Sequence, residues 1–164
     1  MKRVTLMRHA KSSWSTAGLS DHDRPLNQRG QRDTPVMARR LLDKNIRPSL
    51  IITSSAKRAL ETSKLLARNI GYPIEFMHTE KSLYLADENR LLETIELQED
   101  TFNDIVICAH NPGITDLANR LTRQSIENVP TCGMVTIEAD TDHWSNFSEA
   151  SRSLMDFDYP KKSD

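Results

Sequence analysis

The chain of 164 residues has little cysteine, little aromatic side chain and no long apolar run. Its two cysteines, Cys108 and Cys132, are too few and too far apart to form a metal knuckle. No apolar stretch approaches the roughly 18 residues of a membrane-spanning helix, and the segment that follows Met1 is too short for a signal peptide. A formal net charge of -1 leaves no basic excess for nucleic acid. We therefore expect a cytoplasmic protein that binds neither membrane nor nucleic acid.

The remaining composition is that of an ordinary globular protein. Hydrophobic residues make up 37% of the chain and charged residues 27%. No internal repeat, low-complexity tract or linker divides the sequence, so residues 1–164 are interpreted as a single domain, large enough to bury a core without disulfides. Cys108 lies inside the apolar run 105–109 and is expected to be a buried, inert thiol. A monomer is the default expectation.

Short apolar segments alternate with segments of helical periodicity. Strands are predicted at residues 2–8, 50–53, 74–77, 105–109, 134–137 and 153–157. Helices are predicted at about 28–44, 56–69, 91–97 and 114–121. Asn27 can cap the first helix, Ser54 or Ser55 the second, and Gly71 can close the second. Pro35 should either kink the first helix or mark its true start.

Strands separated by helices predict a parallel sheet that is covered on both faces. We expect an α/β fold, a three-layer α/β/α sandwich, with a mostly parallel central sheet and one antiparallel edge strand. The neighbouring cations Arg39 and Arg40 are interpreted as a solvated helix face.

Polar side chains follow three of the predicted strands, at the point where each strand ends. Arg8 and His9 follow the first strand, Ser54 ends the second with Arg58 close behind, and His110 follows the strand at 105–109. Each residue taken singly has an ordinary structural interpretation. The carboxyl ends of parallel strands meet at one edge of a sheet, so these side chains are expected to converge. Arg58 also falls in the first turn of a helix, which favours an anion.

Two arginines and two histidines in one pocket predict phosphoryl chemistry. The cations disfavour protonation of His9 and should hold its pKa below the usual value of about 6.5. A neutral imidazole can attack phosphorus, while Arg8 and Arg58 bind the phosphoryl oxygens. No acidic cluster has the spacing of metal ligands, so neither a metal nor another cofactor is expected.

The same residues carry a resemblance to a known family. The stretches that match it are LMRHAK at 6–11, DRPLNQRG at 23–30, TSSAKRALET at 53–62 and AHNPG at 109–113, with LY at 83–84 and FDYPK at 157–161. In this order and spacing they resemble the histidine phosphatase superfamily, which has the phosphoglycerate-mutase-like fold, and within it the small bacterial phosphohistidine phosphatases of the SixA type.

The resemblance implies a phosphoenzyme intermediate on His9, with Arg8 and Arg58 binding the phosphoryl group and His110 completing the pocket. Larger relatives carry a glutamate acid in the segment that here reads Ser-Leu-Tyr-Leu at 82–85, and they carry insertions over the pocket. This chain has no carboxylate in that segment. A phosphoester benefits from a strong acid, whereas the P–N bond of phosphohistidine is labile.

The favoured hypothesis is therefore removal of phosphate from phosphohistidine on a protein, such as a phosphorelay or phosphotransferase component. Two alternatives remain open: a small-molecule phosphomonoester phosphatase of the same superfamily, and a phosphate-binding module without turnover. Four residues are candidates for substrate contact: Lys11, Ser12, Asn111 and Glu88. Trp14 could line the entrance or cover the edge of the core. Asp21, Asp23 and Arg24 are expected to pin the loop after the first strand.

Overall fold

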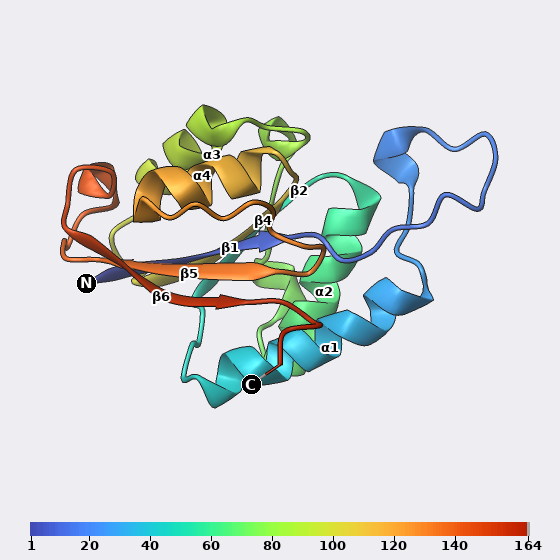
Figure 1. The fold of residues 1–164 in the computed structure, drawn as a ribbon, viewed down its shortest axis with the longest axis horizontal. Helices are drawn as coiled ribbons and strands as arrows, with labels where there is room; N and C mark the ends of the chain where they lie inside the picture. Colours follow the sequence, from blue (N-terminus) through green and yellow to red (C-terminus); the bar gives the residue numbers. More distant parts are fainter. Residues whose placement is uncertain (164) are drawn as a thin grey trace.

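The computed structural model describes residues 1–163, in which strands and helices alternate along most of the chain (Figure 1). The strands are β1 (Lys2–Arg8), β2 (Leu50–Ser54), β3 (His78–Glu80), β4 (Asp104–Ala109), β5 (Met134–Ala139) and β6 (Arg152–Asp158). The α-helices are α1 (Gln28–Asp43), α2 (Lys57–Ile70), α3 (Glu88–Glu96) and α4 (Gly113–Thr122). Short 3-10 helices span Asp21–Asp23, Ile74–Phe76, Lys81–Leu83 and Trp144–Asn146.

The strands form one mixed sheet in the order β3-β2-β4-β1-β5-β6. The pairs β3–β2, β2–β4 and β4–β1 are parallel, and β5 is antiparallel to both of its neighbours. Helices α3 and α4 cover one face of the sheet, and α1 and α2 cover the other (Figure 1). The α/β fold with a mostly parallel sheet is confirmed. The edge strand β6 pairs antiparallel with its neighbour β5, as predicted, and β5 inside the sheet is also antiparallel to β1.

The two faces of the sheet bury separate apolar clusters, and the alternation of side chains along each strand explains the division. In β1, Val4 and Leu6 join the cluster that packs under α3 and α4, whereas Met7 joins the cluster under α1 and α2. The amphipathic helices supply the other half of each cluster, for example Leu117 of α4 and Leu66 of α2. A sheet buried on both faces holds its strand ends in fixed positions. No helix within residues 1–163 combines the length and apolarity needed to cross a membrane.

Some local predictions were wrong. Neither Ser54 nor Ser55 is the N-cap of α2; Ala56 takes that position without a side-chain bond. The predicted strand at 74–77 is a 3-10 turn, and the edge strand β3 follows it, too short and too exposed to show an apolar pattern. Helix α1 begins directly after Asn27, whose side chain accepts from Gly30 N–H, and it continues through Pro35. Pro35 therefore does not mark the start of this helix.

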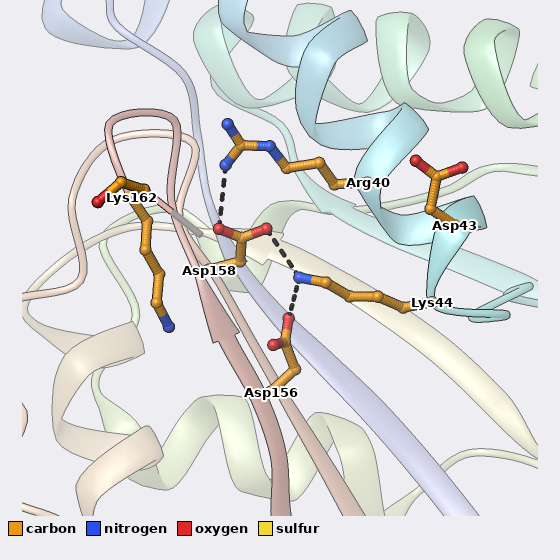
Figure 2. Close-up of a pocket in the computed structure, with 7 residues that line it drawn as sticks. Arg40, Asp43, Lys44, Asp156, Asp158 and Lys162 are labelled. Atoms are coloured by element: carbon orange, nitrogen blue, oxygen red, sulfur yellow. Dashed lines mark hydrogen bonds and ion pairs between the residues drawn. The ribbon is translucent and has the colours of Figure 1, made fainter.

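Arg39 is exposed as predicted, but Arg40 is only partly exposed because the carboxyl-terminal segment contacts it. The Arg40 guanidinium pairs with Asp158 at 3.1 Å (Figure 2). It also donates to the carbonyl oxygens of Tyr159 and Pro160. Lys44 bridges Asp158 and Asp156 of the same strand. These groups border a hollow of about 710 Å³. Their charges are satisfied by one another, and the contacts fasten the edge strand β6 to α1.

Candidate active site

The carboxyl ends of three parallel strands meet at one cavity, as the sequence predicts. His9 follows β1, His110 follows β4, and Arg58 stands in the first turn of α2 after β2. The ring centroids of His9 and His110 are 5.2 Å apart. A cavity of about 180 Å³ is lined by Arg8, His9, Lys11, Ser12, Trp14, Arg24, Arg58, Leu85, His110, Asn111 and Thr131. The structure thus brings together the four residues on which the hypothesis depends.

His9 is buried and held as a neutral imidazole. Its Nδ1 lies 2.8 Å from the carbonyl oxygen of Ala10, so Nδ1 carries the hydrogen and Nε2 keeps a lone pair. Nε2 lies 3.4 Å from Nε of Arg58. Burial, which has the largest effect, and the nearby charges of Arg58, Arg8 and Arg24 together lower the pKa of His9 to about 4, although the bond to Ala10 O acts in the opposite direction. Around neutral pH, Nε2 is therefore unprotonated, and its lone pair accepts the Nε–H of Arg58.

His110 has one satisfied and one unsatisfied ring nitrogen. Its Nε2 lies 2.8 Å from the hydroxyl of Ser54, which also accepts from Ala56 N–H. The Ser54 hydroxyl can donate its own hydrogen to Nε2, which leaves the ring hydrogen on Nδ1. That Nδ1 is buried and has no partner in the structure. Burial and the electrostatic effect of His9 and Arg58 lower the pKa of His110 to about 3. The buried Nδ1–H of His110 is therefore left without an acceptor among residues 1–163.

The cavity is strongly cationic. Arg8, Lys11, Arg24 and Arg58 all line it. The arginine groups are held by protein oxygens: Arg8 donates to Val129 O, and Arg58 donates to the carbonyl and carboxylate of Asp21. The Nε of Arg8 is buried and has no hydrogen-bond partner within residues 1–163. Guanidinium groups fixed in this way are prepared to bind a tetrahedral dianion.

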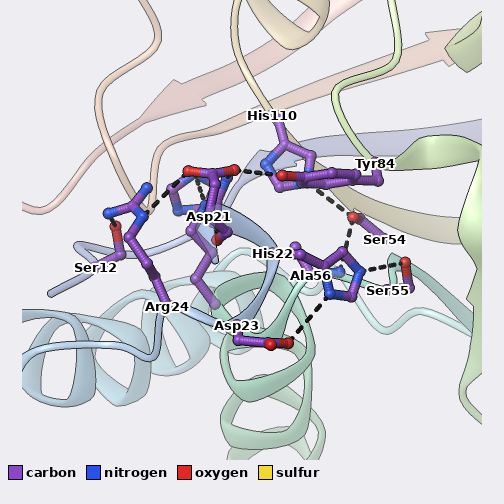
Figure 3. A network of polar contacts seen from close by, with 12 residues as sticks. Ser12, Asp21, His22, Asp23, Arg24, Ser54, Ser55, Ala56, Tyr84 and His110 are labelled. Atoms are coloured by element: carbon purple, nitrogen blue, oxygen red, sulfur yellow. Dashed lines mark hydrogen bonds and ion pairs between the residues drawn. The ribbon is translucent and has the colours of Figure 1, made fainter. Parts of the chain in front are cut away.

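Asp21 is the centre of a polar network. The sequence predicted only that Asp21 helps to pin the loop after the first strand. Asp21 accepts from Arg24 at 3.1 Å, from Arg58 at 3.0 Å and from the Tyr84 hydroxyl (Figure 3). The bond from Tyr84 and the bond and charge of Arg58 lower the pKa of Asp21 to about 2, against a weaker effect of desolvation. Arg24 does pin the loop after β1, and it also supplies a third guanidinium to the cavity. The Asp-x-x-Arg spacing of 21 and 24, one helical turn, was the available signal.

The four candidates for substrate contact fall in different places. Lys11 is exposed at the rim, and the buried Ser12 hydroxyl accepts from Arg24 at 2.8 Å. Asn111 lines the cavity, but its amide oxygen accepts from Thr115 and its amide nitrogen donates to other partners. Glu88 is not among the lining residues, and its carboxylate lies 3.6 Å from Arg120.

Close backbone approaches hold the loops of the site in place. A Cβ on Gly30 would lie 2.3 Å from the carbonyl oxygen of Lys11, and a Cβ on Gly113 would lie 2.2 Å from that of Ala86. Both positions therefore require glycine. The Thr62 hydroxyl accepts from Ala10 N–H and so ties the loop after β1 to α2. Within residues 1–163, no group of three or more histidine, cysteine, aspartate or glutamate side chains is arranged to hold a metal ion.

Comparison with known proteins places this geometry in a family. The model of the histidine phosphatase superfamily (branch 1) matches residues 4–80, which include Arg8, His9 and Arg58. An uncharacterized protein of Mycobacterium leprae is 31% identical over 94% of this chain and all of its own length. An uncharacterized chloroplastic protein of Arabidopsis thaliana is 30% identical over 87% of this chain and 69% of its own length.

Solved structures show the same fold. A candidate phosphohistidine phosphatase, SixA of Agrobacterium tumefaciens, superposes with a TM-score of 0.82 at 25% identity, covering 97% of this chain and 98% of that one. A mycobacterial glucosyl-3-phosphoglycerate phosphatase has a TM-score of 0.71 at 15% identity, covering 97% of this chain and 100% of that one. The chain belongs to the histidine phosphatase superfamily and resembles its SixA-type phosphohistidine phosphatases.

Proposed function

We propose that the protein removes phosphate from phosphohistidine on another protein, through a phosphate covalently held on His9. The observation that carries this proposal is a buried, neutral imidazole whose Nε2 lone pair is directed among fixed guanidinium groups. Simple anion binding has no use for such a nucleophile, because an ammonium or amide donor would serve equally well. Turnover is therefore favoured over a phosphate-binding role.

The reaction takes two steps. The lone pair on Nε2 of His9 forms a bond to phosphorus while the P–N bond to the substrate imidazole breaks, and the electron pair of that bond stays on the leaving nitrogen. Water then attacks the phosphorus of phospho-His9, the new P–N bond breaks, and inorganic phosphate and a proton are released. Arg8 and Arg58 hold the phosphoryl oxygens in both steps, and the bond to Ala10 O stabilises the positive ring of phospho-His9.

The acid–base groups near the cavity favour a P–N substrate over an ester. Tyr84 stands in the segment where larger relatives carry glutamate, and its hydrogen bond to Asp21 raises the pKa of the phenol. Asp21 itself has a pKa of about 2 and is ionised near neutral pH. Neither group is a ready proton donor to an alkoxide. A phosphohistidine that is protonated on its other ring nitrogen leaves as neutral imidazole and needs no such donor.

The test compares substrates and variants directly. Purified protein is incubated with a histidine-phosphorylated phosphotransfer protein and separately with p-nitrophenyl phosphate, with and without a metal chelator. We expect faster cleavage of phosphohistidine, no effect of the chelator, and loss of activity in His9→Ala. His78→Ala, on the exposed strand β3, is the matched control and should retain activity. Ester cleavage that equals or exceeds phosphohistidine cleavage would contradict the protein-substrate proposal and favour a phosphomonoesterase.

A further inference from the structure

Trp14 has an unusual position for a large apolar side chain. Its indole is 78% exposed, yet it lines the same cavity as His9 and Arg58. The guanidinium carbon of Arg24 lies 3.4 Å from the centroid of the indole ring. At that distance the guanidinium stacks on one face of the ring, and the exposed fraction leaves the opposite face open to solvent. An exposed indole that lines a cationic cavity can contact a bound substrate.

The indole is also held in place, because Arg24 is itself fixed. Arg24 is buried and donates to the Ser12 hydroxyl at 2.8 Å and to the Asp21 carboxylate at 3.1 Å (Figure 3). Asp21 in turn accepts from Arg58, whose Nε faces the nucleophile His9. A continuous series of polar contacts thus connects the nucleophile to the plane of the indole. The open face of Trp14 is preorganised relative to the phosphoryl site.

The direction of phosphoryl transfer determines where the leaving group lies. The attacking and leaving atoms lie roughly in line through phosphorus. His9 attacks from the buried floor of the cavity, so the leaving group lies toward the mouth. Two exposed apolar side chains, Trp14 and Leu85, line the cavity there.

We propose that Trp14 is a stacking platform for a planar leaving group, the imidazole ring of phosphohistidine. This inference rests on the proposed function and extends it by naming a residue that determines specificity for the ring. With a planar ring stacked on its open face, the indole would lie between that ring and the Arg24 guanidinium. Aromatic pairs prefer such offset-stacked arrangements and strengthen binding beyond the burial of area.

The test uses two small substrates that share the P–N bond and differ in the ring. Phosphoramidate has no ring, and free phosphohistidine has the imidazole. Values of kcat/KM are measured for both substrates with wild type, Trp14→Leu and Trp14→Phe. We expect Trp14→Leu to lose about threefold to tenfold on phosphohistidine with little change on phosphoramidate, and Trp14→Phe to recover most of the loss. Phosphoramidate turnover also reports whether Arg24 and the phosphoryl site remain intact.

The controls separate the ring contact from other effects. Phe76→Leu removes another exposed aromatic ring (66%, against 78% for Trp14) that does not line the cavity, and its substrate ratio should match wild type. Equal losses on both substrates in Trp14→Leu would overturn the proposal and assign Trp14 to the support of Arg24. The histidine-phosphorylated phosphotransfer protein serves as a third substrate. A loss of activity in Trp14→Leu on this protein alone, with free phosphohistidine unaffected, would also overturn the proposal and assign Trp14 to protein docking. If wild type cleaves phosphoramidate but not phosphohistidine, the proposed function fails together with the inference.

Discussion

Acidification should destabilise this protein through the histidines of the cavity. His9 is buried as the neutral form, with its pKa lowered from 6.5 to about 4. In the unfolded chain it takes up a proton as the pH falls through about 6.5, whereas the folded protein binds that proton only near pH 4. Between these values the unfolded state binds more protons, so its free energy falls relative to the folded state. The free energy of unfolding therefore decreases with falling pH across this window and levels off below it.

The size of the effect follows from the two pKa values. Going from neutral pH to about pH 5, linkage at His9 alone removes about 2 kcal/mol from the free energy of unfolding. His110, whose pKa is lowered to about 3, should remove a similar amount. Each contribution is a substantial fraction of the total stability of about 5–15 kcal/mol that is typical of a domain.

Urea unfolding at about pH 7 and about pH 5 measures this effect. The variant His9→Asn removes the titrating ring, and its amide N–H can still donate to Ala10 O. Its loss of stability on acidification should be about 2 kcal/mol smaller than that of wild type. His78→Asn, on the exposed strand β3, is the matched control and should lose as much as wild type. Equal losses in wild type and His9→Asn would refute the claim that His9 is held neutral.

Three further outcomes are expected. Arg58→Lys should lower kcat by about 100-fold or more with the fold intact, because an ammonium cannot reproduce the guanidinium donors, and steady-state kinetics measure this. Gly113→Ala should lower the free energy of unfolding by about 1–3 kcal/mol, because its Cβ would lie 2.2 Å from Ala86 O. Urea titration measures this loss, and an unchanged midpoint would contradict the prediction. Burial raises the pKa values of Cys108 and Cys132 to about 12, so both thiols should resist iodoacetamide near pH 8 until urea unfolds the chain.

The sequence was sufficient to predict the principal elements of the site. The apolar runs that end in Arg8-His9 and in His110 are short and buried on both faces, so their strand identity followed from the runs themselves. Their common edge followed from the alternation of strands and helices, which predicts a parallel sheet. The cap at Asn27 and the terminating Gly71 were equally well marked. In each case the local pattern and the tertiary packing favour the same structure.

The remaining features depend on contacts between segments far apart in the chain. The residues near Arg40 in the sequence do not predict its pairing with Asp158, which lies 118 positions away. Tyr84 likewise lies 63 positions from its acceptor Asp21. The edge strand β3 has three residues and no apolar periodicity, so only its pairing with β2 identifies it. The order of strands at the β5–β6 edge is likewise a property of the assembled sheet.

The most direct test of the mechanism is detection of phosphate on His9 itself. The protein is mixed with a histidine-phosphorylated substrate, quenched rapidly in alkali to preserve any P–N bond, and digested for mass spectrometry. We predict phosphate on the peptide that contains His9, lost on treatment with acid and absent from His9→Asn. Undiminished phosphate release by His9→Asn, or phosphate found only on another residue, would contradict the account.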